Sequence, residues 1–212
     1  MMKMKTDGVI FDLDGTLWDA TAGITAVWNE ILRREEPDMP LFTQQQIQGC
    51  MGMLLPDIGR RLFPNAQPER QQALVDEFCR QEQALLRRTG GTLYPGMRET
   101  LQRLHGDFPL FIVSNCQDGY IECFFEAHAM APLFCDTECS GRTGLPKAQN
   151  IILLAQRNGL KAPVYVGDTA LDGQSARAAG VPFIHARYGF GTADGADAVI
   201  DSITGLPGLL ER

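Results

Sequence analysis

The chain is short of positive charge. Its 19 lysines and arginines stand against 26 aspartates and glutamates, which gives a formal net charge of -7. Nucleic acids and anionic membrane surfaces are bound by a concentrated positive field. The composition therefore disfavours a nucleic-acid or membrane partner and favours a small molecule. Both a monomer and a homodimer fit the sequence.

Long apolar runs are also missing. No uncharged stretch of about eighteen residues occurs, so no membrane-spanning helix is expected. The apolar stretch near the N-terminus is interrupted by Asp7, Asp12 and Asp14, so it cannot form the core of a signal peptide. The six cysteines include no CxxC pair, and without an export signal they are expected to be reduced thiols. These absences predict a cytoplasmic protein.

Short apolar runs alternate with segments of helical spacing. The runs lie at 8–11, 110–113, 164–166 and 182–184, and have the composition of strands buried on both faces. The expected helices lie at 97–105, 121–128, 147–158 and 174–179. This alternation indicates parallel strands with helices on both faces. The predicted fold class is α/β, a doubly wound, three-layer, Rossmann-like parallel sheet.

The stretch 18–91 breaks the alternation. Helices are expected at about 20–34, 43–48, 53–62 and 67–88, with prolines between them. We predict a core domain made of residues 1–17 and 92–212, with an all-helical domain inserted at 18–91. The Gly90-Gly91 pair and the turn at Tyr94-Pro95-Gly96 mark the return to the core.

The segment Asp12-Leu13-Asp14-Gly15-Thr16 directly follows the first strand. A carboxylate at the end of a parallel strand, such as Asp12, can attack phosphorus and carry the phosphoryl group. In an extended chain Asp14 points to the same side, where it can protonate the leaving oxygen and then activate water. Gly15 permits close approach of the backbone, and its amide is expected to face the phosphoryl oxygens. An isolated Asp-Gly pair would indicate only a turn.

Asp168 and Asp172 follow the third strand. Parallel strands open toward one edge of the sheet, so these acids and Asp12 should converge. Converging carboxylates repel one another unless a cation lies among them. Oxygen ligands favour Mg²⁺ over zinc. The alternative for Asp172 is a cap on a helix that begins near residue 173.

Donors for a phosphate group follow elsewhere. Ser114 and Asn115 come after the second strand, and Lys147 begins a predicted helix. A cation at a helix N-terminus is unfavourable for the helix dipole, so Lys147 suggests an anion nearby. It would neutralise charge on the transferred group. The alternative is a solvated surface lysine.

These residues together resemble the four motifs of haloacid dehalogenase-like hydrolases, in the family's order and over the whole chain. The motifs are Asp12-Leu13-Asp14-Gly15-Thr16, Ser114-Asn115, Lys147 and Gly167-Asp168-Thr169-Ala170-Leu171-Asp172. The helical insert is similar to the C1-type cap of the phosphoglycolate phosphatase-like branch.

The resemblance implies a role for each position. Asp12 is expected to be the nucleophile and a metal ligand, and Asp14 the general acid/base and a ligand through its carbonyl. Ser114 and Lys147 are expected to bind phosphate, and Asp168 and Asp172 to ligate or support Mg²⁺. Gly15, Thr16 and Asn115 are expected to contact the substrate.

The implied activity is a Mg²⁺-dependent phosphatase that hydrolyses a small phosphorylated metabolite, phosphoglycolate-like or a sugar phosphate, through an aspartyl-phosphate. A phosphomutase of the β-phosphoglucomutase type and an inorganic pyrophosphatase share the motifs and stay open. A catalytically silent binding protein is the non-enzymatic alternative. Asp14 disfavours the metal-independent dehalogenases, which lack a second acid in the first motif.

Substrate choice is expected to lie in the helical insert. Gly49 and Gly52 would let the loop at 49–53 bend over the site, and Arg60 would contact a carboxylate or second phosphate of the substrate. The alternatives are a plain helix–helix turn and a solvated arginine. Trp18 and Trp28 are interpreted as packing residues.

Overall fold

The computed structural model describes residues 3–212 and contains a six-stranded parallel sheet. Its strand order is β6-β5-β2-β7-β8-β9, so the order reverses at β2. The strands are β2 (Val9–Phe11), β5 (Leu110–Ser114), β6 (Asp136–Cys139), β7 (Val164–Gly167), β8 (Phe183–Ala186) and β9 (Ala198–Ile200). Phe11 is level with Ile112 of β5 and Val166 of β7. This register places the residues that follow all three strands at one edge of the sheet.

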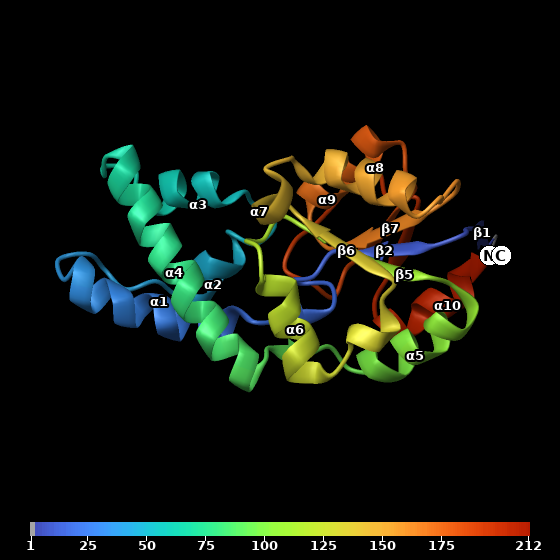
Figure 1. The fold of residues 1–212 in the computed structure, drawn as a ribbon, viewed down its shortest axis with the longest axis horizontal. Helices are drawn as coiled ribbons and strands as arrows, with labels where there is room; N and C mark the ends of the chain where they lie inside the picture. Colours follow the sequence, from blue (N-terminus) through green and yellow to red (C-terminus); the bar gives the residue numbers. More distant parts are fainter. Residues whose placement is uncertain (1–2) are drawn as a thin grey trace.

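Helices cover both faces of this sheet (Figure 1). α8 (Lys147–Arg157) and α9 (Ala170–Ala179) lie on one face, and α5 (Met97–Asp107), α6 (Tyr120–His128) and α10 (Leu206–Leu209) on the other. Successive side chains of β2 point to opposite faces of the sheet. Ile10 belongs to the core beneath α8 and α9, and Phe11 belongs to the core beneath α5 and α6. The predicted three-layer α/β fold is confirmed.

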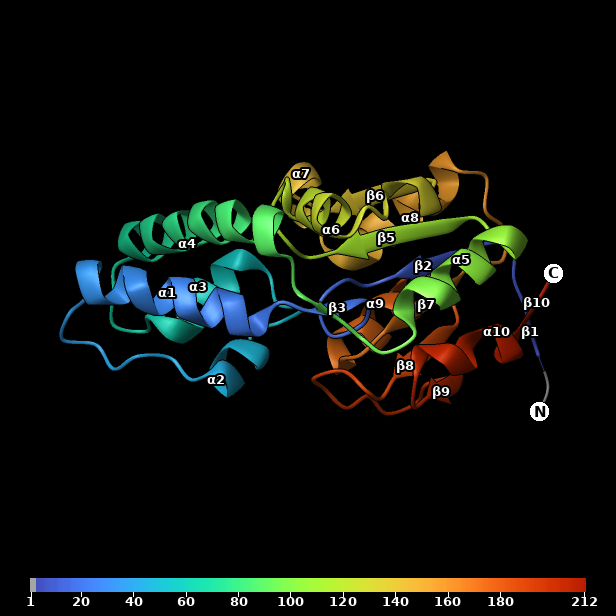
Figure 2. The ribbon, with the colours of Figure 1, turned by 90° about the horizontal axis from the view of Figure 1, so that it is seen from below.

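A group of helices lies beyond the carboxyl ends of the strands (Figure 2). It consists of α1 (Thr21–Glu35), α2 (Gln44–Gln48), α3 (Leu55–Leu62) and α4 (Pro68–Thr89). β3 (Trp18–Asp19) pairs antiparallel with β4 (Thr92–Leu93), which holds the two connections to the sheet side by side. Trp28 of α1 stacks on Phe78 of α4 at 4.7 Å between ring centroids. Across residues 3–212, no helix combines the length and apolar character needed to span a membrane.

Helix α9 begins four residues earlier than the sequence predicts. Thr169 is its N-cap and accepts from the Asp172 amide, while the Asp172 carboxylate accepts from the Thr169 amide. Asp172 therefore lies in the first turn of the helix and not at its cap, because this reciprocal capping box starts the helix at Ala170.

Several elements had no clear sequence signal. β6 carries Asp136 and Glu138, which hide its strand character, and β9 is only three residues long. β1 (Met4–Lys5) pairs with β10 (Leu210–Glu211) and brings the two ends of the described chain together. The short helices η1 (Ala131–Leu133), α7 (Ser140–Thr143) and η2 (Ile203–Gly205) complete the chain.

Candidate active site

Lys147 lies between two aspartates at the edge of the sheet. Its Nζ donates to Asp12 Oδ1 at 2.8 Å and to Asp172 Oδ1 at 2.6 Å. All three side chains are almost fully buried. As predicted, Lys147 is the first residue of α8, and the anions beside it are these two carboxylates. The alternative of a solvated surface lysine is wrong.

The charges of this group depend on each other. Burial raises the pKa of Asp12 to about 6, with Asp172 adding to the rise and Lys147 opposing it. Burial also acts to raise the pKa of Asp172, but the attraction and hydrogen bond of Lys147 outweigh it and hold that pKa below its ordinary value. Burial would lower the pKa of Lys147, yet Asp12 and Asp172 raise it well above its usual range. Lys147 is therefore a permanent cation here.

Asp168 follows β7 and is completely buried. Its Oδ2 accepts from the Phe190 amide at 2.7 Å, and its backbone carbonyl accepts from His185 Nε2 at 3.1 Å. Oδ1 has no hydrogen-bond partner among the described residues. Burial, with repulsion from Asp172 and Asp12, raises the pKa of Asp168 well above its ordinary value. An unpartnered buried carboxylate oxygen is costly unless a cation contacts it.

Asp12, Asp168 and Asp172 can each offer a ligand atom, and these atoms lie within 4.8 Å of one another. The donors are carboxylate oxygens only, which suits a hard divalent cation. The orphaned Oδ1 of Asp168 supports the same conclusion. The residues present thus fit a divalent metal. The carboxylate of Asp14 is outside this group, which is consistent with the expectation that only its carbonyl is a ligand.

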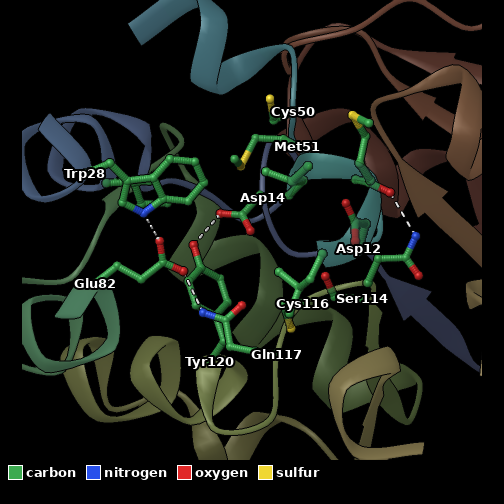
Figure 3. A pocket seen from close by; sticks show the side chains of 16 residues that line it. Asp12, Asp14, Trp28, Cys50, Met51, Glu82, Ser114, Cys116, Gln117 and Tyr120 are labelled. Atoms are coloured by element: carbon green, nitrogen blue, oxygen red, sulfur yellow. Dashed lines mark hydrogen bonds between the residues drawn. The ribbon is translucent and has the colours of Figure 1, made fainter. Parts of the chain in front are cut away.

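The Asp14 carboxylate lines a pocket next to Asp12 (Figure 3). Lys147, Asp168 and Asp172 do not line this pocket. Trp18 Nε1 and Tyr120 OH donate to Asp14 Oδ1 at 2.9 and 3.0 Å. Burial, followed by repulsion from Asp12, raises the pKa of Asp14 to about 8. A carboxyl group with this pKa carries a proton at neutral pH, as a general acid must.

The pocket lies between the sheet edge and the helices α1 to α4, with about 40 Å³ of free space, room for roughly three water molecules. Its helical side, here called the helical wall, consists of Ile24, Trp28, Cys50, Met51, Gly52, Met53, Leu55, Ile58 and Glu82. Its other side consists of Asp12, Asp14, Ser114, Asn115, Cys116, Gln117 and Tyr120.

Gly15 and Thr16 lie in the turn that follows Asp14. The Gly15 amide donates to the Trp18 carbonyl at 2.9 Å, so the expectation that it faces the phosphoryl oxygens is wrong. Gly15 has a φ of +81°, and a Cβ there would overlap the Asp168 carboxylate. Glycine is therefore required for both reasons. Thr16 is buried, with its Oγ1 unpartnered among the described residues.

Ser114 and Asn115 both reach the pocket, but Asn115 also joins the helical group to the sheet. Its Nδ2 donates to the Gly52 carbonyl at 2.8 Å and its Oδ1 accepts from Ser140 Oγ at 2.7 Å. Gly52 lines the pocket with a φ of +78°. Gly49 does not, and lies in a neighbouring hollow beside Arg61 and Thr169.

Arg60 is not brought to the site. Its guanidinium pairs with Asp57 on the exposed side of α3, and its side chain is 64% exposed. It lines a separate hollow between α3 and α4. The expectation that Arg60 contacts substrate is thus not supported, because the apolar face of α3 that carries Leu55 and Ile58 points to the pocket instead.

Comparison with known proteins agrees with this geometry. The family described as haloacid dehalogenase-like hydrolase matches residues 9–186, most of the chain. The chain belongs to this family. A phosphoglycolate phosphatase from Cupriavidus necator is 29% identical over 99% of this chain and 95% of its own. One from Xanthomonas campestris is 29% identical over 88% of this chain and 85% of its own.

Solved structures of the same family show the fold. A haloacid dehalogenase-like hydrolase from Streptococcus pneumoniae has a TM-score of 0.82, with 21% identity over 97% of both chains. The family membership predicted from the sequence is confirmed, and so is the assignment of this chain to the hydrolases.

Four side chains that line the pocket of this haloacid dehalogenase-like hydrolase were not expected there from the sequence. They are Trp28, Glu82, Gln117 and Tyr120. Glu82 had a weak signal, because it occupies a buried helical stripe with Phe78 and Leu86 on either side at four-residue spacing. Trp28 does pack in the core, as interpreted, but it also donates a hydrogen bond in the pocket, and Trp18 does the same for Asp14.

Proposed function

We propose that this chain is a Mg²⁺-dependent phosphatase that hydrolyses a small phosphate monoester through a phosphoryl group carried by Asp12. The observation that carries the proposal is the separation of two acids by their surroundings. Asp12 accepts a hydrogen bond from the cation of Lys147, whereas Asp14 accepts from the neutral side chains of Trp18 and Tyr120. Burial accordingly raises the pKa of Asp14, to about 8, further than that of Asp12, to about 6. The phosphoglycolate phosphatases among its relatives support the substrate class.

The site contains a residue for each step of this reaction. An oxygen of Asp12 attacks phosphorus as Asp14 gives its proton to the leaving alkoxide, which departs as the alcohol. Asp14 then takes a proton from water, and the oxygen of that water attacks the phosphorus of the aspartyl-phosphate. The bond between phosphorus and the Asp12 oxygen breaks, which releases orthophosphate and regenerates the Asp12 carboxylate. Lys147 neutralises part of the charge on the transferred group. Asp12 and Asp168, supported by Asp172, would hold Mg²⁺, which supplies charge stabilisation to the phosphoryl oxygens.

The helical group α1 to α4 serves as the cap in this proposal. It closes the side of the pocket opposite Asp12, and the paired strands β3 and β4 form its joint with the sheet. The protein acts as a monomer or a homodimer.

The decisive experiment is hydrolysis of p-nitrophenyl phosphate by the purified protein with Mg²⁺. We expect release of one orthophosphate per nitrophenol, and a loss of at least about a thousandfold in kcat/KM for Asp12→Asn. Asp38→Asn, an exposed change of the same kind, should retain full activity. Turnover that survives Asp12→Asn would contradict the proposal.

The metal assignment has a test that needs no turnover. Millimolar Mg²⁺ should raise the Tm of the metal-free protein, because a ligand that binds only the folded state stabilises it. Asp168→Asn removes a charge from the cluster and should abolish that rise, while Asp38→Asn should preserve it. An equal rise in Asp168→Asn would refute this site for the metal.

A further inference from the structure

Glu82 is a buried acid that the proposed reaction does not use. It lies on α4 and is only 3% exposed. Trp28 Nε1 donates to its Oε2 and Gln117 Nε2 to its Oε1, both at 2.6 Å. Figure 3 shows the carboxylate held between these two side chains. Both partners are neutral, and within residues 3–212 no lysine or arginine forms an ion pair with Glu82.

The pocket as a whole has charges of one sign. The ionisable carboxylates that line it are Asp12, Asp14 and Glu82, and no basic side chain of the described residues lines it with them. Arg61 lies on the other side of Met53, where its Nη1 donates to the Met53 Sδ at 3.6 Å in a neighbouring hollow. Lys147 contacts Asp12 and Asp172, at the phosphoryl end of the site.

The charge of Glu82 bears on which leaving group the pocket can hold. Each oxygen of a carboxylate can accept more than one hydrogen bond, so Glu82 can take a further donor from a substrate. A hydroxyl or ammonium group would supply that donor. A carboxylate would meet a second carboxylate in a buried place, where repulsion is weakly screened. Burial raises the pKa of Glu82 to about 7, in the direction expected where a negative charge is weakly solvated.

We propose that Glu82 determines the substrate's leaving group: the pocket accepts phosphate monoesters of alcohols that carry hydroxyl or ammonium groups and rejects those that carry a carboxylate. This inference rests on the proposed phosphatase activity. It separates the chain from the phosphoglycolate phosphatases it resembles, because the leaving group of 2-phosphoglycolate carries a carboxylate and would enter the pocket that Glu82 lines.

The test uses four two-carbon phosphate monoesters of nearly equal size. They are 2-hydroxyethyl phosphate, phosphoethanolamine, ethyl phosphate and 2-phosphoglycolate. With the unmodified chain and Mg²⁺ at about pH 8, above the pKa of Glu82, kcat/KM for the hydroxyl and ammonium esters should exceed that for 2-phosphoglycolate by about tenfold or more. Ethyl phosphate, whose ethyl group carries neither a donor nor a charge, should fall between them.

Three variants locate the cause. Glu82→Gln removes the charge and keeps the shape, since Gln117 can rotate its amide to remain a partner. It should reduce the disadvantage of 2-phosphoglycolate relative to 2-hydroxyethyl phosphate by about tenfold. Glu30→Gln, an equal charge change on the exposed face of α1, should leave the ratio unchanged. Arg61→Gln should also leave it unchanged.

The outcomes separate this inference from the proposed function. A wild-type preference for 2-phosphoglycolate, or a ratio that Glu82→Gln does not alter, overturns the role of Glu82 while p-nitrophenyl phosphate is still hydrolysed. Selective loss of 2-phosphoglycolate turnover in Arg61→Gln overturns it too, because Arg61 would then bind the carboxylate. If Glu82→Gln does not fold, the wild-type ranking decides. No hydrolysis of any ester overturns the proposed function and this inference together.

Discussion

The sheet-edge cluster of Asp12, Lys147, Asp168 and Asp172 differs from the helical wall in how charge is compensated. In the cluster, Lys147 pairs with two of the carboxylates, and Oδ1 of Asp168 has no hydrogen-bond partner among residues 3–212. In the helical wall, the donors that the described part of the chain offers to Glu82 are the neutral side chains of Trp28 and Gln117. Compensated charge suits chemistry on a fixed phosphoryl group. A carboxylate without a neighbouring cation suits substrate selection, because its charge changes the affinity of the pocket for charged and hydrogen-bonding leaving groups.

The largest effect on stability is expected from removing the positive charge of Lys147 from the cluster. Lys147→Met leaves Asp12 and Asp172 buried without their cation. Breaking a buried pair in this way should lower the free energy of unfolding by about 3–5 kcal/mol, measured by urea unfolding of the metal-free protein at pH 7. Lys161→Met, at an exposed position, is the control. A loss no larger than that of the control would mean that Lys147 does not stabilise the buried carboxylates of the cluster.

The second prediction concerns the pH dependence that Glu82 creates. Its pKa is about 7 in the folded protein against 4.5 in the unfolded chain, so the folded state holds the proton more tightly. The contribution of Glu82 to stability is therefore complete below about pH 4.5 and is lost as pH rises through about 7. Relative to wild type, Glu82→Gln should gain up to about 3 kcal/mol between pH 4.5 and pH 8.

The measurement is the difference in unfolding free energy between Glu82→Gln and wild type at several pH values, since the subtraction removes the other acids. Glu30→Gln should show no such trend. A difference that stays constant with pH would mean that Glu82 is compensated after all, and the contrast between the two regions would disappear.

The third prediction tests how tightly the turn packs on the cluster. Gly15→Ala requires a residue with a side chain at a φ of +81° and drives its Cβ into Asp168. Gly180→Ala requires a φ of +71° but meets only open space. Both should lose about 1–2 kcal/mol of stability from the left-handed backbone. Only Gly15→Ala should also weaken the rise in Tm produced by Mg²⁺, and equal metal responses would show that Asp168 can move aside.

The smallest effect is expected at Arg60. Arg60→Ala removes an exposed ion pair with Asp57, away from both regions. Its stability should change by less than about 0.5 kcal/mol, and kcat/KM should be unchanged for all four esters. A selective fall in kcat/KM for one ester would mean that Arg60 contacts the substrate, so that the residues selecting the substrate would include an exposed residue outside the pocket.

Much of the cluster could be predicted because each member sits at the end of a strand or the start of a helix. Asp12 and Asp168 directly follow buried runs, and parallel strands bring such positions to one edge. The helical wall could not be predicted in the same way. Glu82 lies 54 residues from Trp28 and 35 from Gln117, so only the packing of α4 against α1 and α6 joins them.

The alternation of strands and helices, the helical insert and the acids at the strand ends could all be predicted from the amino-acid sequence. These depend on local periodicity and on the geometry common to parallel sheets. Only the folded chain shows that Lys147 bridges Asp12 and Asp172, and that Glu82 rather than Arg60 reaches the pocket. Such contacts depend on how far one helix is rotated against another, which local pattern does not specify.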